Sequence, residues 1–277
     1  MNSLFSWKNL CFLLCFALLA GCSKDDEPDP LLPPLVWPDD IATAIPDSFF
    51  REYCLERNDK DGDGRLSKEE VVTVTSMSYL TRPPIHTLEG IAYFSNLKKL
   101  SLQNCTASSL DLRYNSRLED INLMGLESLT VLRGPVGYAP LMVDFYDVCN
   151  LQELDLSGCG NVRSLHLGMK GTVGSTLTSV SLPDASHMQY LSVSAANQAS
   201  YETLLAGASN LVQLFCHFYP GAVLDLSACA KLNELVVQTT SDSALRKLRL
   251  RKNAPLSYRF ETFDEHGERS LEIEYVE

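Results

Sequence analysis

The sequence predicts an α/β-type repeat solenoid with parallel strands and a back wall that is mostly irregular or built of short strands. Three observations carry this prediction. A frame that reads Leu-x-x-Leu-x-Leu restarts eight times, and an apolar residue stands six places before each restart in every case but one, a proline. The third observation is a twelve-residue acidic loop ahead of the repeats, which predicts a small helix-loop-helix module in front of the solenoid.

The repeat frames open at apolar residues spaced by a nearly constant step. The openers are Leu97, Leu118, Leu141, Val162, Met188, Leu211, Leu232 and Leu256, and successive openers lie 21, 23, 21, 26, 23, 21 and 24 residues apart. Steps in this range are typical of leucine-rich repeats. A single coil cannot bury its own apolar residues, so stacked coils close a shared core.

A second set of residues predicts the opposite wall of each coil. This set comprises Ile91, Leu112, Pro135, Leu156, Leu182, Leu205, Leu226 and Leu250. The frames at Leu141 and Leu256 depart from the pattern, and Pro135 replaces the upstream leucine. We therefore expect an irregular coil near residue 141 and a C-terminal cap, within a leucine-rich repeat domain that spans residues 85–277.

Two segments carry a resemblance to a known family. Leu88-Glu-Gly-Ile91-Ala-Tyr-Phe94-Ser-Asn-Leu97 and Ser109-Leu-Asp-Leu112-Arg-Tyr-Asn115 resemble the leucine-rich repeat lipoproteins of Bacteroidetes and, more distantly, internalins. The resemblance covers about two thirds of the chain. It implies an elongated, curved scaffold whose strand-bearing face holds a protein or a glycan, while the motif identifies the fold and not the ligand.

The first 21 residues are predicted to be a lipoprotein signal peptide. Lys8 is their only charge, and the apolar run at residues 11–20 is too short to span a bilayer comfortably. The run ends in Leu19-Ala20-Gly21-Cys22, which resembles a bacterial lipobox and implies that Cys22 is lipidated. The alternative is an ordinary cleaved signal that happens to carry a cysteine. Lipid chains on Cys22 would anchor the protein to a membrane.

Residues 22–44 are predicted to be an acidic, proline-rich tether. Pro28, Pro30, Pro33, Pro34 and Pro38 favour extended conformations. Residues 23–27 resemble the acidic export tag of surface lipoproteins in Bacteroidetes, which implies an outer-membrane protein that faces outward. A solvated linker is the alternative interpretation.

Composition limits the partners and the chemistry. The formal net charge of −12 at pH 7 argues against nucleic acid and against broad contact with anionic membrane. The sequence has none of the common catalytic or nucleotide-binding motifs, so we expect no enzyme, although a carboxylate pair assembled across coils stays an alternative. Six cysteines lie outside the signal peptide and are not Cys22, and we expect most of them to be buried free thiols. They are Cys54, Cys105, Cys149, Cys159, Cys216 and Cys229.

Residues 59–70 match the EF-hand loop, which binds Ca²⁺ through hard oxygen ligands. The candidate ligands are Asp59, Asp61, Asp63, the backbone carbonyl of Arg65, Ser67 and Glu70. Three acids on alternate residues of a tight loop repel one another unless a cation lies among them. The alternative is that Ser67 and Glu70 only form a capping box for the next helix.

The flanks of this loop have helical patterns, so residues 45–80 are predicted to be an EF-hand-like cap. Phe49, Phe50, Tyr53 and Cys54 have helical spacing before the loop, and Val71 and Val72 continue a helix after it. A single hand without a partner favours a structural ion over a sensor. We expect calcium to order this cap over the first coil.

Alternate positions of each frame are expected to point outward and to form the ligand-binding face. The candidates are Lys99, Asp120, Asn122, Phe145, His166, Tyr190, Phe215 and His217. Phe145, Tyr190 and Phe215 are predicted to form an aromatic stripe that binds a partner or stacks on sugar rings. The alternative is a register slip in the irregular coil that turns Phe145 inward.

One basic cluster, at residues 246–252, is expected to lie on a solvated back wall; docking of an acidic partner or a sulfated glycan is the alternative. Together these features predict a calcium-binding, lipid-anchored surface protein for non-covalent recognition of a protein or glycan, in adhesion or host interaction. The alternative function is an accessory lipoprotein in glycan or nutrient capture.

Overall fold

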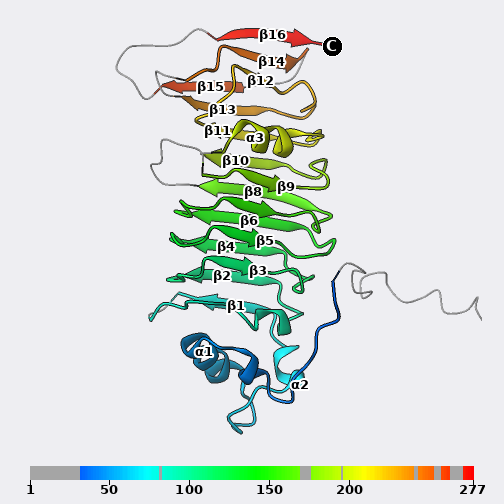
Figure 1. The fold of residues 1–277 in the computed structure, drawn as a ribbon. Helices are drawn as coiled ribbons and strands as arrows, with labels where there is room; N and C mark the ends of the chain where they lie inside the picture. The colour runs from blue at the N-terminus through cyan, green and yellow to red at the C-terminus, as the bar shows by residue number, and fades with distance from the viewer. Residues whose placement is uncertain are drawn as a thin grey trace, which may run out of the picture. The chain divides into compact units, whose positions relative to one another are not determined.

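A computed structural model describes residues 32–80, 83–168, 176–194, 196–239, 243–252, 257–262 and 271–277 (Figure 1). The chain divides into two units, Met1–Pro34 and Leu35–Glu277. The predicted signal peptide, Cys22 and the acidic residues after it lie outside the described residues. In the described part, no helix combines the length and the apolarity that a membrane crossing requires.

The unit from Leu35 to Glu277 is a β-solenoid whose front wall is a nine-stranded parallel sheet. Its strands, in spatial order, are β1 (Ser76–Tyr79), β2 (Lys99–Gln103), β4 (Asp120–Met124), β6 (Leu141–Tyr146), β8 (Val162–Gly168), β10 (Tyr190–Ser194), β11 (Gln213–His217), β13 (Glu234–Thr239) and β15 (Ser257–Thr262). Each strand between the two edge strands, β1 and β15, pairs with those of the preceding and following coils, as stacked repeats require.

The back wall consists of short parallel strands (Figure 1). One sheet contains β3 (Ser109–Asp111), β5 (Val131–Arg133), β7 (Glu153–Asp155) and β9 (Ser179–Ser181), and another contains β12 (Val223–Asp225), β14 (Lys247–Arg251) and β16 (Glu272–Val276). Between them in sequence, α3 (Gln198–Leu205) takes the place of a back-wall strand. Asn197 caps this helix by accepting the Ser200 N–H, because four N–H groups at a helix start lack backbone partners.

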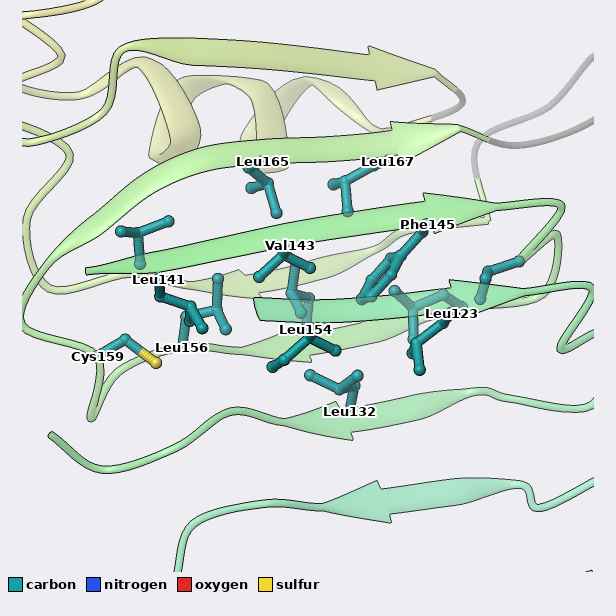
Figure 2. Close-up of a cluster of buried hydrophobic side chains, with 14 of the residues drawn as sticks. Leu123, Leu132, Leu141, Val143, Phe145, Leu154, Leu156, Cys159, Leu165 and Leu167 are labelled. Atoms are coloured by element: carbon teal, nitrogen blue, oxygen red, sulfur yellow. The ribbon is translucent and has the colours of Figure 1, made fainter. Parts of the chain in front are cut away.

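Two columns of front-wall side chains fill the interior, each aligned by strand register. One column is Met77, Leu100, Ile121, Val143, Leu165, Leu191, Leu214 and Leu235; the other is Tyr79, Leu102, Leu123, Phe145, Leu167, Val193, Cys216 and Val237. All are buried. Figure 2 shows Leu123, Val143, Phe145, Leu165 and Leu167 extending toward Leu132 and Leu154 of the back wall.

The repeat openers are buried, as the sequence predicts. The seven described openers, from Leu97 to Leu232, are all buried, whereas Leu256 lies outside the described residues. Of the upstream set, only Leu182 is partly exposed, and Pro135 is buried in place of a leucine. The parallel-strand repeat solenoid is therefore confirmed.

The irregular coil lies at β6, and it reverses one prediction. The register between β6 and β8 shifts after Leu141, because Met142 pairs with Ser164 and Arg163 is left as an extra residue. In β6 the inward residues stand two and four places after the opener instead of three and five. Phe145 consequently points into the core and is fully buried, so its predicted place on the ligand-binding face is wrong.

The segment before the first repeat is packed rather than a free tether up to residue 44. The 3-10 helix η1 (Ile41–Ala44) buries Ile41, and the Trp37 ring lies 5.4 Å from the Tyr93 ring in an edge contact. The predicted tether therefore ends too late. Burial of these aromatic and aliphatic groups stabilises the packed segment.

Two helices flank the acidic loop, and the second is short. Helix α1 (Ser48–Asn58) is followed by α2 (Lys68–Val71), which is a single turn. The chain then enters β1, which pairs with β2. The solenoid thus begins inside the range 45–80 predicted for the cap.

The C-terminal residues continue both walls, since β15 pairs with β13 and β16 pairs with β14. The basic cluster lies at β14, where Lys247 Nζ is 2.9 Å from Glu272 Oε1 and Arg249 Nε is 2.8 Å from Glu274 Oε2. These cross-strand ion pairs partly neutralise the cluster on the back wall. The C-terminal cap stays a prediction.

Candidate functional site: recognition face and acidic loop

The outward positions of the front wall fall into three register rows. Seven of the eight predicted face residues lie in these rows and are exposed or partly exposed: Lys99, Asp120, Asn122, His166, Tyr190, Phe215 and His217. Phe145 is the exception. Its reversed strand instead presents Met142, Asp144 and Tyr146 outward.

Four aromatic rings form a continuous series across β6, β8, β10 and β11. Tyr146 meets His166 edge to face with centroids 4.9 Å apart, and His166 is 6.5 Å from Tyr190. Tyr190 and Phe215 follow with centroids 5.6 Å apart and planes tilted by 38°. The aromatic stripe therefore exists with Tyr146 in place of Phe145. The sequence did not predict Tyr146 at an outward position, because the leucine frame assigns inward and outward residues of this strand the wrong way round.

Asp144 lies beside this ring series, with its Oδ1 4.0 Å from His166 Nδ1. Burial raises the pKa of Asp144, and the nearby imidazole only partly opposes this effect. Burial also lowers the pKa of His166, which keeps the imidazole neutral at pH 7. In the described part of the chain, Asp144 is thus a partly buried carboxylate whose one ion-pair contact is a neutral imidazole.

Side-chain hydrogen bonds hold the far side of the face. Gln213 Nε2 donates to Glu234 Oε2 at 2.6 Å, and His217 Nδ1 contacts Gln238 Oε1. Ser194 Oγ donates to the carbonyl of Leu167 at 2.9 Å. These bonds join neighbouring strands and restrict the polar side chains before any partner arrives.

The acidic loop gathers three of its predicted metal ligands. Ligand atoms of Asp59, Asp61 and Asp63 all lie within 4.8 Å of one another. The Asp59 carboxylate accepts the N–H groups of Gly62 (2.7 Å) and Gly64 (2.9 Å), and both glycines have positive φ, of 75° and 79°. Glycine suits these positions because it adopts left-handed conformations without steric cost. Three convergent carboxylates on such a turn fit a hard divalent cation.

The two remaining side-chain candidates form the capping box that was the alternative interpretation. Glu70 accepts N–H groups of Lys60 (2.7 Å, at Oε1) and Ser67 (2.9 Å, at Oε2), and Ser67 Oγ also donates to it. These hydrogen bonds lower the pKa of Glu70. Glu70 and Ser67 are outside the three-aspartate cluster. A carboxylate has about four acceptor sites, and the N–H groups of Lys60, Asp61 and Ser67 and the Ser67 hydroxyl all act on Glu70, so coordination of a cation would replace some of these hydrogen bonds.

The backbone of the loop is held by the chain's own N-terminal segment. Ile41 N–H donates to the Leu66 carbonyl at 2.9 Å, and Leu66 N–H donates to Asp40 Oδ1 at 3.0 Å. Leu66 is fully buried. The sequence has no second EF-hand-like loop that could pair with this one. Asp40 and Ile41 instead form hydrogen bonds with the backbone N–H and C=O groups of Leu66.

Helix α1 joins the loop to the first coil through two polar contacts. Asp47 caps α1 and also accepts the His86 N–H at 2.7 Å. Tyr53 Oη donates to the Ser78 carbonyl (2.9 Å) and accepts the Ser78 N–H (3.0 Å). Since β1 is an edge strand, Tyr53 satisfies backbone groups that no neighbouring strand can reach.

The six cysteines of the described ranges are free, and all of them but Cys149 are buried. Burial raises the pKa of Cys159 and of Cys216 to about 12. These two thiols are therefore protonated at neutral pH and pack as small apolar groups. The expectation of buried free thiols is confirmed for five of the six.

No protein-family model and no curated protein matches the chain. Among solved structures, it is distantly similar to the functional domain of InlJ from Listeria monocytogenes, which includes a cysteine ladder. Identity is 19%, the TM-score is 0.29, and the match covers 81% of this chain but only 61% of that one.

An internalin (inlF) from Listeria monocytogenes is similar at 13% identity and a TM-score of 0.28, with 83% of this chain and 94% of that chain covered. Scores this low carry no argument about function. The assignment of the fold rests on the strand pairing described above.

Proposed function

We propose that this chain is a lipid-anchored surface protein that recognises a protein or glycan non-covalently through the front wall of its solenoid. The observation that carries the proposal is the ring series from Tyr146 to Phe215 at outward positions of four adjacent strands. Aromatic side chains contribute large contact areas with little loss of conformational freedom, which suits a binding surface. The proposal includes no catalytic step.

The acidic loop has a structural role in this proposal, as an EF-hand-like site for Ca²⁺. The ligands would be Asp59, Asp61, Asp63, the Arg65 carbonyl, Ser67 and Glu70. A bound ion neutralises the converging carboxylates and fixes the loop, whose buried Leu66 packs with the core. Loops of this kind in extracellular modules work with dissociation constants of about 10⁻⁴ to 10⁻³ M.

The N-terminal proposal is attachment to the outer membrane through acylated Cys22. Labelling growing cells with an alkyne fatty acid tests it, because the wild-type chain is expected to take up label and the Cys22→Ala variant is not. Cys149→Ala is the matched control and should keep the label. Equal labelling of the wild-type chain and Cys22→Ala would contradict lipidation at this residue.

Recognition is tested by screening the full-length chain against host matrix proteins and a glycan array. Binding should weaken at least about tenfold in Tyr190→Ala, since this ring lies between His166 and Phe215. The control is Tyr138→Ala, whose side chain is 83% exposed at a site off the front wall. Ligands that bind both variants equally well would refute the front wall as the binding surface.

A further inference from the structure

The carboxylate of Asp144 lies in an apolar part of the front wall. Met142 and Tyr146 flank it along β6, and Met124 pairs with Tyr146 from β4. Met142, Tyr146 and Met124 are exposed residues, whereas Asp144 is partly buried. A charged group is thus set among the most exposed apolar side chains of the face.

Asp144 accepts no hydrogen bond from any residue in the described ranges between 32 and 277. Among the described residues, its one ion-pair contact is with His166 at 4.0 Å, whose imidazole burial keeps neutral, and nearby Asp120 repels the carboxylate. A carboxylate that loses water without gaining a donor carries an energetic cost. A cation that arrived with a partner would remove this cost.

Within the described residues, the strands next to Asp144 present no such cation, and the outward lysine of the face, Lys99, lies on β2, two strands from β6. The outward positions of β4, β6, β8, β10, β11 and β13 include neither lysine nor arginine. Arg163, the extra residue at the β8 bulge, directs its Nε to Asn161 Oδ1 at 3.3 Å. Asp120 and Glu234 add negative charge to the same rows.

We propose that Asp144 anchors a subsite for an arginine side chain of a protein partner. A guanidinium group pairs with a carboxylate through parallel hydrogen bonds and stacks on tyrosine, and the stem of arginine packs on methionine. Exposed methionine and aromatic groups are typical of protein interfaces, which favours a protein over a glycan. This subsite rests on the proposed recognition function and specifies its partner.

A displayed library of random dodecapeptides, selected on the full-length chain, tests the subsite. Selection on the wild-type chain should enrich arginine, and selection on Asp144→Asn should not. The matched control is Glu153→Gln, which removes one negative charge from the back wall and should leave arginine enrichment unchanged. Replacing the enriched arginine by citrulline, its neutral isostere, should weaken binding to the wild-type chain at least about tenfold.

A melting temperature of Asp144→Asn equal to that of the wild-type chain shows that the variant folds. Peptides without enriched arginine, equal enrichment on Asp144→Asn, or equal affinity of the arginine and citrulline peptides would each overturn the subsite. If such ligands still require Tyr190, the recognition function stands without it. Glycan ligands that require Tyr190, with no peptide selected, also overturn the subsite and keep the function. Failure to find any ligand that requires Tyr190 overturns both.

Discussion

Truncation of Phe145 tests the reversed register of β6 directly. The Phe145→Ala variant removes a fully buried ring that stands in one column with Leu123 and Leu167 (Figure 2). The leucine frame alone places this ring on the solvent side, where its loss would cost little. The strand register places it in the core, where its loss leaves a cavity between two coils.

The expected cost follows from the buried area of the ring. A buried phenylalanine removes roughly 150–200 Å² from water, and at about 25 cal/mol per Å² this corresponds to about 4–5 kcal/mol. Alanine keeps part of that area, while the cavity adds a further term, so the free energy of unfolding should fall by about 3–5 kcal/mol. Equilibrium urea denaturation followed by circular dichroism measures the difference.

Tyr146→Ala is the matched control on the neighbouring residue. Tyr146 is an exposed residue (42%) whose ring contacts His166, so its loss should cost less than about 1 kcal/mol. A cost below about 1 kcal/mol for Phe145→Ala, or a larger cost for Tyr146→Ala, would refute the assigned register.

Three further predictions concern the N-terminal part of the structure. Calcium at ten times its dissociation constant should stabilise the wild-type chain by about 1.4 kcal/mol, measured by thermal melting. Asp61→Asn should lose this stabilisation, whereas the control Glu69→Gln should keep it. A wild-type melting temperature that does not change when a chelator is added would contradict the proposed site. Tyr53→Phe removes both hydrogen bonds to Ser78 and should cost about 1–3 kcal/mol, with faster hydrogen exchange of the Ser78 amide; unchanged protection of that amide would disprove the contact. For Asp47, burial raises the pKa, but the N–H groups of Phe50, His86 and Phe49 more than offset it, and the folded pKa is lowered. The stability from Asp47 is therefore present above its unfolded pKa of about 3.9 and is lost as pH falls through the lower folded value, so acid titration of stability should be shallower in Asp47→Asn than in the wild-type chain.

Much of the solenoid could be predicted from residue spacing because the core columns repeat with the coils. The steps between openers such as Leu97 and Leu118 imply one strand per coil, and these openers are buried. The first coil was missed because Val74-Thr-Ser-Met77-Ser-Tyr79 fits the frame without containing a leucine. Phe145 was misplaced because a one-residue shift exchanges the two faces of a strand, and composition does not reveal it.

The candidate sites divide in the same way. The aspartates of the acidic loop were predicted because their ligand spacing is local in sequence, and Asp59, Asp61 and Asp63 do converge. Contacts between distant segments, such as Asp40 with Leu66, have no local signal. Asp144 was missed for a related reason, since its setting depends on side chains from three strands.

The hydrogen bonds between the Tyr53 hydroxyl and the Ser78 backbone limit where repeats can be added to such a solenoid. A coil added ahead of β1 would have to displace helix α1 and leave a phenol without its two partners. A coil inserted between two existing coils instead packs against strand edges and apolar side chains that already pack against a neighbouring coil. Gain or loss of repeats during evolution is therefore expected within the stack, with the N-terminal boundary kept in place.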